Sequence, residues 1–209
     1  MKGPGILLAC AMLVNGCAVG NKYDYRVADM ALPVKGQSSV GLMIADKRPY
    51  VLSGNKDPSF VGLQRGGFGN PFDVTTMTGA PLASDIAEAV AAGLRERGYT
   101  VRVIGYVSGD AGDMLVSAAK KDGLSKTIAV TIREWKTDIY MKMTLHYDLE
   151  AVVYGADGSI LGRNRMAAIE EVGGSGIGAE KNAHTARQAL SQKISYLFYH
   201  PDIKKALDG

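Results

Sequence analysis

Residues 141–154, MKMTLHYDLEAVVY, alternate between apolar and polar side chains more regularly than any other part of the chain. Apolar side chains occupy the odd positions from Met141 to Val153, and polar ones occupy the even positions from Lys142 to Glu150. Successive side chains of a β-strand point to opposite faces, so this pattern places all the apolar residues on one face. It predicts a long strand with one buried face and one solvated face.

Two further strands are predicted beside this one. Residues 127–135 alternate in the same way, and residues 160–172 follow the turn sequence Gly155-Ala156-Asp157-Gly158-Ser159. Glycine and aspartate in so short a connection are typical of β-hairpins. The three segments therefore predict an antiparallel meander in the C-terminal half of the chain.

Two segments have the spacing of amphipathic helices. Over residues 82–97 an apolar residue recurs at every fourth position, Pro81 precedes the stripe and Gly98 follows it. Proline at the start and glycine after the end are the usual boundaries of a helix. Residues 179–199 carry an apolar residue at every third or fourth position. Shorter helices are expected over residues 110–121 and 202–207.

The remaining segments complete an α/β (α+β) fold. Residues 39–46 and 99–104 are rich in apolar residues and predict two more strands. With the meander, this element order predicts a mixed sheet that ends in a C-terminal antiparallel three-strand meander, with the helices packed mainly on one face.

The segments that have a helical or strand period of apolar residues indicate the extent of the folded domain. We expect one folded domain over residues 39–209, interrupted by a Gly/Pro-rich insert at about 48–80. Within the insert, residues 60–64 and 72–76 can pair as a hairpin across a glycine-rich loop. Residues 17–38 have no sustained period, and we expect them to form a flexible tether.

The N-terminus has the pattern of a bacterial export signal. Lys2 is followed by nine consecutive apolar residues, 6–14, which are too few to cross a bilayer core of about 30 Å. The next residues, Val14-Asn15-Gly16-Cys17, resemble the lipobox of bacterial lipoproteins, in which the chain is cut before the cysteine and the thiol carries a diacylglycerol. We therefore interpret residues 1–16 as a lipoprotein signal peptide, Gly16 and Cys17 as its cleavage site and Cys17 as the lipidation site. Ordinary secretion, with Gly16-Cys17-Ala18 as a small-residue cleavage site, is the alternative.

Composition excludes several classes of protein. Of the 209 residues, 46% are hydrophobic and 22% charged, which is typical of a globular domain. Lys and Arg number 24 against 21 acidic residues, a balance that gives no support to nucleic-acid binding. The two cysteines are Cys10, inside the signal, and Cys17, so the mature domain is expected to have no disulfide and no Cys-ligated metal. No cofactor is expected either.

Several short motifs, taken in order, resemble the YajG family of bacterial lipoproteins. They are the lipobox, Asp46-Lys47-Arg48-Pro49 after the first strand, Arg97-Gly98-Tyr99 after the first long helix, and Lys181-Asn182 at the start of the last one. The resemblance implies an outer-membrane lipoprotein that faces the periplasm and has no established enzymatic activity. The element order is also similar to that of TolB N-terminal domains.

Few residues suggest a binding or catalytic site. Asp46 and Arg48, at a strand end, can either bind a ligand or form a local ion pair that fixes the turn, and the ion pair is the favoured interpretation. Residues 174–179 match G-x-G-x-x-A, but the preceding strand belongs to an antiparallel meander, so we interpret them as a strand-to-helix turn. The sequence around Ser175 misses the G-x-S-x-G nucleophile pattern. The three histidines are too far apart in sequence to predict a metal site: His146, His184 and His200.

Aromatic residues in or beside the meander can fill the core or mark an interface, and the core is the commoner use. These residues are Trp135, Tyr140, Tyr147 and Tyr154. The function we expect is that of a non-enzymatic binding or accessory subunit of an envelope assembly, anchored by lipid in the outer membrane and partnered by an envelope protein. The alternative is a periplasmic protein that binds a small ligand or peptide through the Gly/Pro-rich insert.

Overall fold

The computed structural model describes residues 20–108, 112–174 and 178–208, and their strands form one mixed, eight-stranded sheet. The strands are β1 Lys22–Tyr23, β2 Ser39–Asp46, β3 Phe60–Arg65, β4 Pro71–Thr76, β5 Thr100–Ser108, β6 Lys126–Ile139, β7 Met143–Gly155 and β8 Ile160–Gly173. The helices are α1 Pro49–Leu52, α2 Leu82–Glu96, α3 Gly112–Asp122, α4 Ala179–Tyr199 and α5 Pro201–Asp208. The predicted α+β class is confirmed.

Strand β6 organises the sheet because its 14 residues are long enough to pair with three strands. Along one edge it pairs with β7 in antiparallel register, and β7 pairs in turn with β8, which confirms the predicted meander. Along the other edge, its first half pairs with β2 and its last residues pair with β3, both in parallel. Strand β5 extends the sheet beyond β2, while β4 and β1 extend it beyond β3.

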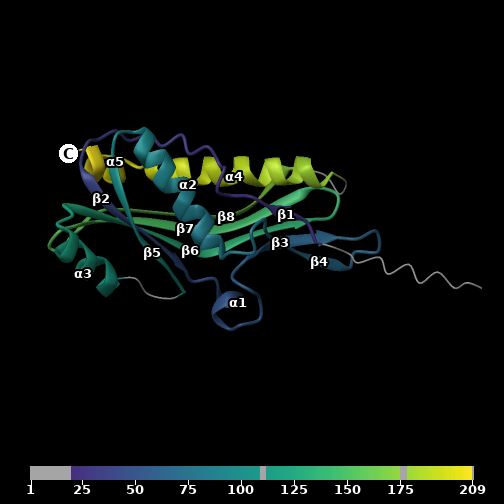
Figure 1. The fold of residues 1–209 in the computed structure, drawn as a ribbon. Coiled ribbons are helices and arrows are strands. Elements are labelled where there is room, and N and C mark those ends of the chain that lie inside the picture. The colour runs from purple at the N-terminus through teal and green to yellow at the C-terminus, as the bar shows by residue number, and fades with distance from the viewer. Residues whose placement is uncertain (1–19, 109–111, 175–177, 209) are drawn as a thin grey trace, which may run out of the picture.

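Helices α2, α4 and α5 cover one face of the sheet, as Figure 1 shows. The apolar stripes of these helices and the alternating residues of the meander form one large buried core. Helix α3 lies on the opposite face, where a smaller apolar cluster joins Leu115 to Met43, Ala45 and Ala129. The helices are therefore packed mainly on one face, as predicted.

The segment before β2 is part of the core, so the expectation of a flexible tether is wrong for residues 20–38. Five of its large apolar side chains are buried: Tyr23, Tyr25, Met30, Leu32 and Val34. The indole Nε1 of Trp135 donates a hydrogen bond to the Tyr25 hydroxyl at 3.1 Å. The chain here is mostly irregular, so its burial leaves no helical or strand period in the sequence.

The Gly/Pro-rich insert is also ordered. It contains α1 and the β3–β4 hairpin, whose strands match the predicted pairing of residues 60–64 with 72–76. Gly62 permits the close approach of β3 to β6, because a Cβ there would lie 2.1 Å from the Thr137 hydroxyl oxygen. The insert therefore widens the sheet.

Candidate functional site

Asp46 and Arg48 form a buried ion pair at the end of β2. The guanidinium donates from Nε to Asp46 Oδ1 at 2.9 Å and from Nη2 to Asp46 Oδ2 at 2.7 Å. It also donates to the carbonyl oxygens of Pro58 and Phe60. Burial alone would lower the pKa of Arg48, but the hydrogen bonds and charge of Asp46 outweigh it and raise the pKa. The pair fixes the turn, as the favoured interpretation predicted.

The aromatic residues of the meander divide between core and surface. Trp135 and Tyr147 are buried, Tyr154 is partly buried and Tyr140 is half exposed in the turn between β6 and β7. Among the described residues, no group of three or more His, Cys, Asp and Glu side chains is arranged to hold a metal ion. Burial lowers the pKa of His146, which favours its neutral form at neutral pH.

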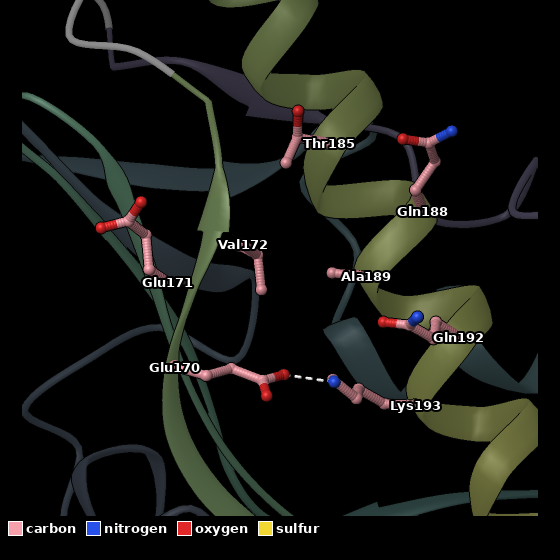
Figure 2. Close-up of a pocket in the computed structure, with 8 residues that line it drawn as sticks. All are labelled: Glu170, Glu171, Val172, Thr185, Gln188, Ala189, Gln192 and Lys193. Carbon is pink, nitrogen blue, oxygen red and sulfur yellow. Dashed lines mark ion pairs between the residues drawn. The ribbon is translucent and has the colours of Figure 1, made fainter.

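A polar cleft of about 520 Å³ lies between β8 and α4 (Figure 2). We call it the β8–α4 cleft, and it is lined by Glu170, Glu171, Val172, Thr185, Gln188, Ala189, Gln192 and Lys193. At its base, the Lys193 ammonium forms an ion pair with Glu170 although the lysine is only 6% exposed. The ammonium also lies 5.1 Å from the centre of the Tyr147 ring, a cation–π contact.

Several polar groups of the β8–α4 cleft are already paired within the protein. Lys193 is held by a carboxylate and an aromatic ring, and the Thr185 hydroxyl donates to the Lys181 carbonyl at 3.0 Å. The amides of Gln188 and Gln192 also line the cleft, and Gln192 Nε2 donates to the Tyr196 hydroxyl at 3.5 Å. A second cleft, of about 690 Å³, lies on the other side of α4 and shares both glutamines.

A smaller cleft of about 190 Å³ opens on the opposite face of the sheet. Glu150 is buried there between Arg133 and Arg163 and accepts a hydrogen bond from each. Burial opposes ionisation of Glu150, but the two arginines outweigh it and lower its pKa. The charges of the two arginines balance that of Glu150, so ion pairs within the protein stabilise the buried carboxylate.

Sequence reasoning missed the Lys193–Glu170 pair. One signal was present, because Lys193 lies three residues after Leu190 and four before Leu197, within the apolar stripe of α4. A lysine in such a stripe predicts a buried partner, but only the packing of α4 on β8 identifies that partner as Glu170.

Several predicted site residues fall outside the described part of the chain. These are Gly16 and Cys17, with the whole signal segment, and residues 175–177 of the G-x-G-x-x-A pattern. The elements around that pattern are an antiparallel edge strand, β8, and the helix α4. No described helix is both long and apolar enough to cross a membrane.

Comparison with known proteins gives structural similarity only. No family model and no curated protein matches the chain. Protein XCC0632 from Xanthomonas campestris, described with the family model DUF330, is similar at 14% identity and a TM-score of 0.48, over 86% of this chain and 91% of that one. Lipoprotein GNA1162 from Neisseria meningitidis is similar at 12% identity and a TM-score of 0.39, over 76% of this chain and 99% of that one.

A PelC dodecamer from Paraburkholderia phytofirmans is similar at 12% identity and a TM-score of 0.44, over 85% of this chain and 95% of that one. One of these three proteins is described as a lipoprotein, and none is described as a YajG protein. At these identities and scores, no ligand, activity or assembly is transferred to this chain.

Proposed function

We propose that this chain is a bacterial lipoprotein of the outer membrane, anchored through Cys17, that faces the periplasm and acts as a non-enzymatic binding or accessory subunit of an envelope assembly. One observation carries the proposal. Residues 14–17 resemble a lipobox at the end of an apolar run of signal-peptide length, and Cys17 lies three residues before Gly20, which packs against β4. Two or more acyl chains on one residue hold a protein firmly on a membrane.

The packing of Gly20 supports a short connection to the anchor. A Cβ at Gly20 would lie 1.8 Å from the carbonyl oxygen of Asp73 in β4, so the backbone lies directly against the sheet. Three residues of extended chain span about 10 Å at most. A lipid on Cys17 would therefore hold the domain close to the membrane, and not some tens of ångströms away as a flexible tether over 17–38 would.

The accessory role is supported by the outer edge of the meander. Strand β8 has 14 residues and, within the described chain, pairs with β7 alone. Its free edge can accept a further strand, and three of its apolar side chains are exposed: Ile160, Leu161 and Ile169. These features fit a protein partner better than a small molecule.

The alternative function, a periplasmic binder that uses the Gly/Pro-rich insert, has less support. The insert forms α1 and the β3–β4 hairpin, and residues 48–80 line none of the clefts described above. A small polar ligand would fit better in the β8–α4 cleft.

The proposal is tested by labelling growing cells with radioactive palmitate and separating their membranes. The native chain is compared with Cys17→Ser. We expect label in the outer-membrane fraction for the native chain and its loss on substitution. A soluble, unlabelled native chain in the periplasm would overturn the lipoprotein assignment and favour the free binder.

A further inference from the structure

The two strands next to Gly20 show where the anchor would emerge. Strand β1 runs parallel to β4, with Lys22 opposite Thr75 and Tyr23 opposite Thr76, and Gly20 lies against Asp73. From Tyr23 back to Gly20, the chain runs along β4 toward Pro71 and the loop that joins β3 to β4. Gly20 therefore lies toward the loop end of the β3–β4 hairpin, and a lipid on Cys17 would lie within about 10 Å of it.

A second loop lies at the same end of the sheet. Strands β3 and β6 are parallel, and Gln64 near the end of β3 is opposite Ile139 at the end of β6. The hairpin loop, residues 66–70, and the turn between β6 and β7, residues 140–142, therefore leave the sheet side by side. Figure 1 shows the hairpin at the end of the molecule opposite α3 and α5. We call this the anchor end.

Large apolar side chains are exposed on both loops of the anchor end. Phe68 is fully exposed at the hairpin tip, and in the neighbouring turn Met141 is 78% exposed and Tyr140 is half exposed. Glycines flank Phe68, and the turn closes with hydrogen bonds from Gly66 N to Asn70 O and from Gly69 N to Gly66 O. Phe68 therefore lies beyond Gln64, the last residue of β3 that pairs with β6.

The charges near the anchor end are largely paired. Arg65 binds Asp138 at 2.6 Å, and Lys142 binds Glu171 at 2.8 Å. Residues 66–70, Gly-Gly-Phe-Gly-Asn, carry no charge, so no ion must be dehydrated when this loop enters an apolar environment. The surface is therefore suited to apolar contact with lipid and does not depend on anionic headgroups.

We propose that the β3–β4 hairpin inserts Phe68 into the interface of the bilayer that holds the lipid anchor, with Tyr140 and Met141 at headgroup level. This inference rests on the proposed lipidation of Cys17, since one exposed phenylalanine binds a membrane weakly by itself. The anchor makes its insertion an intramolecular event at high effective concentration. The contact orients the domain, so that α3 and α5 point away from the membrane.

The test uses the full lipidated chain with Phe68→Trp, reconstituted in phosphatidylcholine vesicles whose acyl chains are brominated. Bromine quenches tryptophan only on contact within the bilayer. The native Trp135 is fully buried and gives a constant background. The matched control is Tyr199→Trp, because Tyr199 is also exposed and lies at the far end of α4, about 30 Å from the helix start at 1.5 Å per residue.

We expect the emission of Phe68→Trp to shift to shorter wavelength and to be lost in brominated vesicles, while Tyr199→Trp keeps its emission. If the lipidated chain floats with the vesicles but Phe68→Trp is quenched no more than Tyr199→Trp, the insertion is overturned and the anchor stands. If the chain carries no lipid and does not float, the proposed function fails and this inference fails with it.

Discussion

The side chain of Arg48 joins the end of β2 to the start of β3 through its hydrogen bonds to Asp46, Pro58 and Phe60. Removing one partner of a buried ion pair leaves an uncompensated charge and costs about 3–5 kcal/mol. We therefore expect Arg48→Ala to lower the free energy of unfolding by about that amount, as measured by urea denaturation. The site is fully buried, so the remaining Asp46 carboxylate cannot be hydrated without local opening.

The exposed ion pair between Arg165 and Asp148 provides the control. It has the same two-point geometry, at 2.6 and 2.8 Å, but the arginine is about half exposed. Exposed pairs contribute about 0–1 kcal/mol, so Arg165→Ala is expected to change stability little. Equal losses in the two variants would mean that burial does not determine the importance of Arg48.

Asp85 in α2 is a buried carboxyl whose two oxygens have no hydrogen bond of ordinary geometry in the described chain. Burial, with a smaller contribution from the charge of Asp24, raises the pKa of Asp85 to about 6. Because the folded state binds this proton more tightly than the unfolded state, the stabilisation is complete below the ordinary pKa of 3.8 and is lost as pH rises through about 6.

Asp85→Asn is therefore expected to stabilise the domain above pH 6, by on the order of 1–2 kcal/mol, and to flatten the dependence of stability on pH between about 4 and 6. Thermal unfolding at a series of pH values measures both effects. Glu96→Gln removes an exposed acid of the same helix that is not among the charges acting on Asp85, so it is the control and should leave the profile unchanged. A profile that Asp85→Asn does not alter would contradict the assignment.

At the scale of single residues, the sequence predicts contacts that are local and misses those that packing creates. Asp46 and Arg48 are two residues apart at a strand end, and their pairing could be anticipated. The burial of Asp85 and the pairing of Lys193 with Glu170 depend on how helices lie on other segments, and no local pattern encodes that placement.

At the scale of elements, the packing of residues 20–38 can be tested with one pair of variants. Leu32 is fully buried and Val27, in the same segment, is 66% exposed. Leu32→Ala is expected to cost about 2–5 kcal/mol in denaturant unfolding, the range for truncating a buried leucine. Val27→Ala should cost less than about 0.5 kcal/mol. If Leu32→Ala leaves the free energy of unfolding unchanged, residues 20–38 are not packed in the core and the flexible tether is the better description.

Elements with a strong period were predicted closely. The helix over 179–199 has the predicted bounds, and the meander has the predicted strands and connections. Their apolar residues follow the geometry of one regular element, so the spacing alone identifies them. Residues 20–38 pack instead as an irregular chain, in which buried side chains follow no fixed spacing.

At the scale of the whole molecule, the domain has two different ends along the length of the sheet. The start of β1 and the β3–β4 hairpin lie at one end, and α3 and α5 lie at the other (Figure 1). This arrangement would leave the free edge of β8 along the side of an upright domain, accessible to a partner. The sequence predicts the lipid anchor. The proposed orientation of the domain on the membrane depends on the register of β1 on β4, which no sequence pattern indicates.

The proposed function depends on a mature chain that begins at a lipidated Cys17. Its most direct test is mass spectrometry of the N-terminal tryptic peptide, residues 17–22, from the chain purified out of membranes. We expect a peptide that starts at Cys17 and carries the mass of a diacylglycerol, with or without a further acyl group on the amine. An unmodified peptide, or one that begins at another residue, would contradict it.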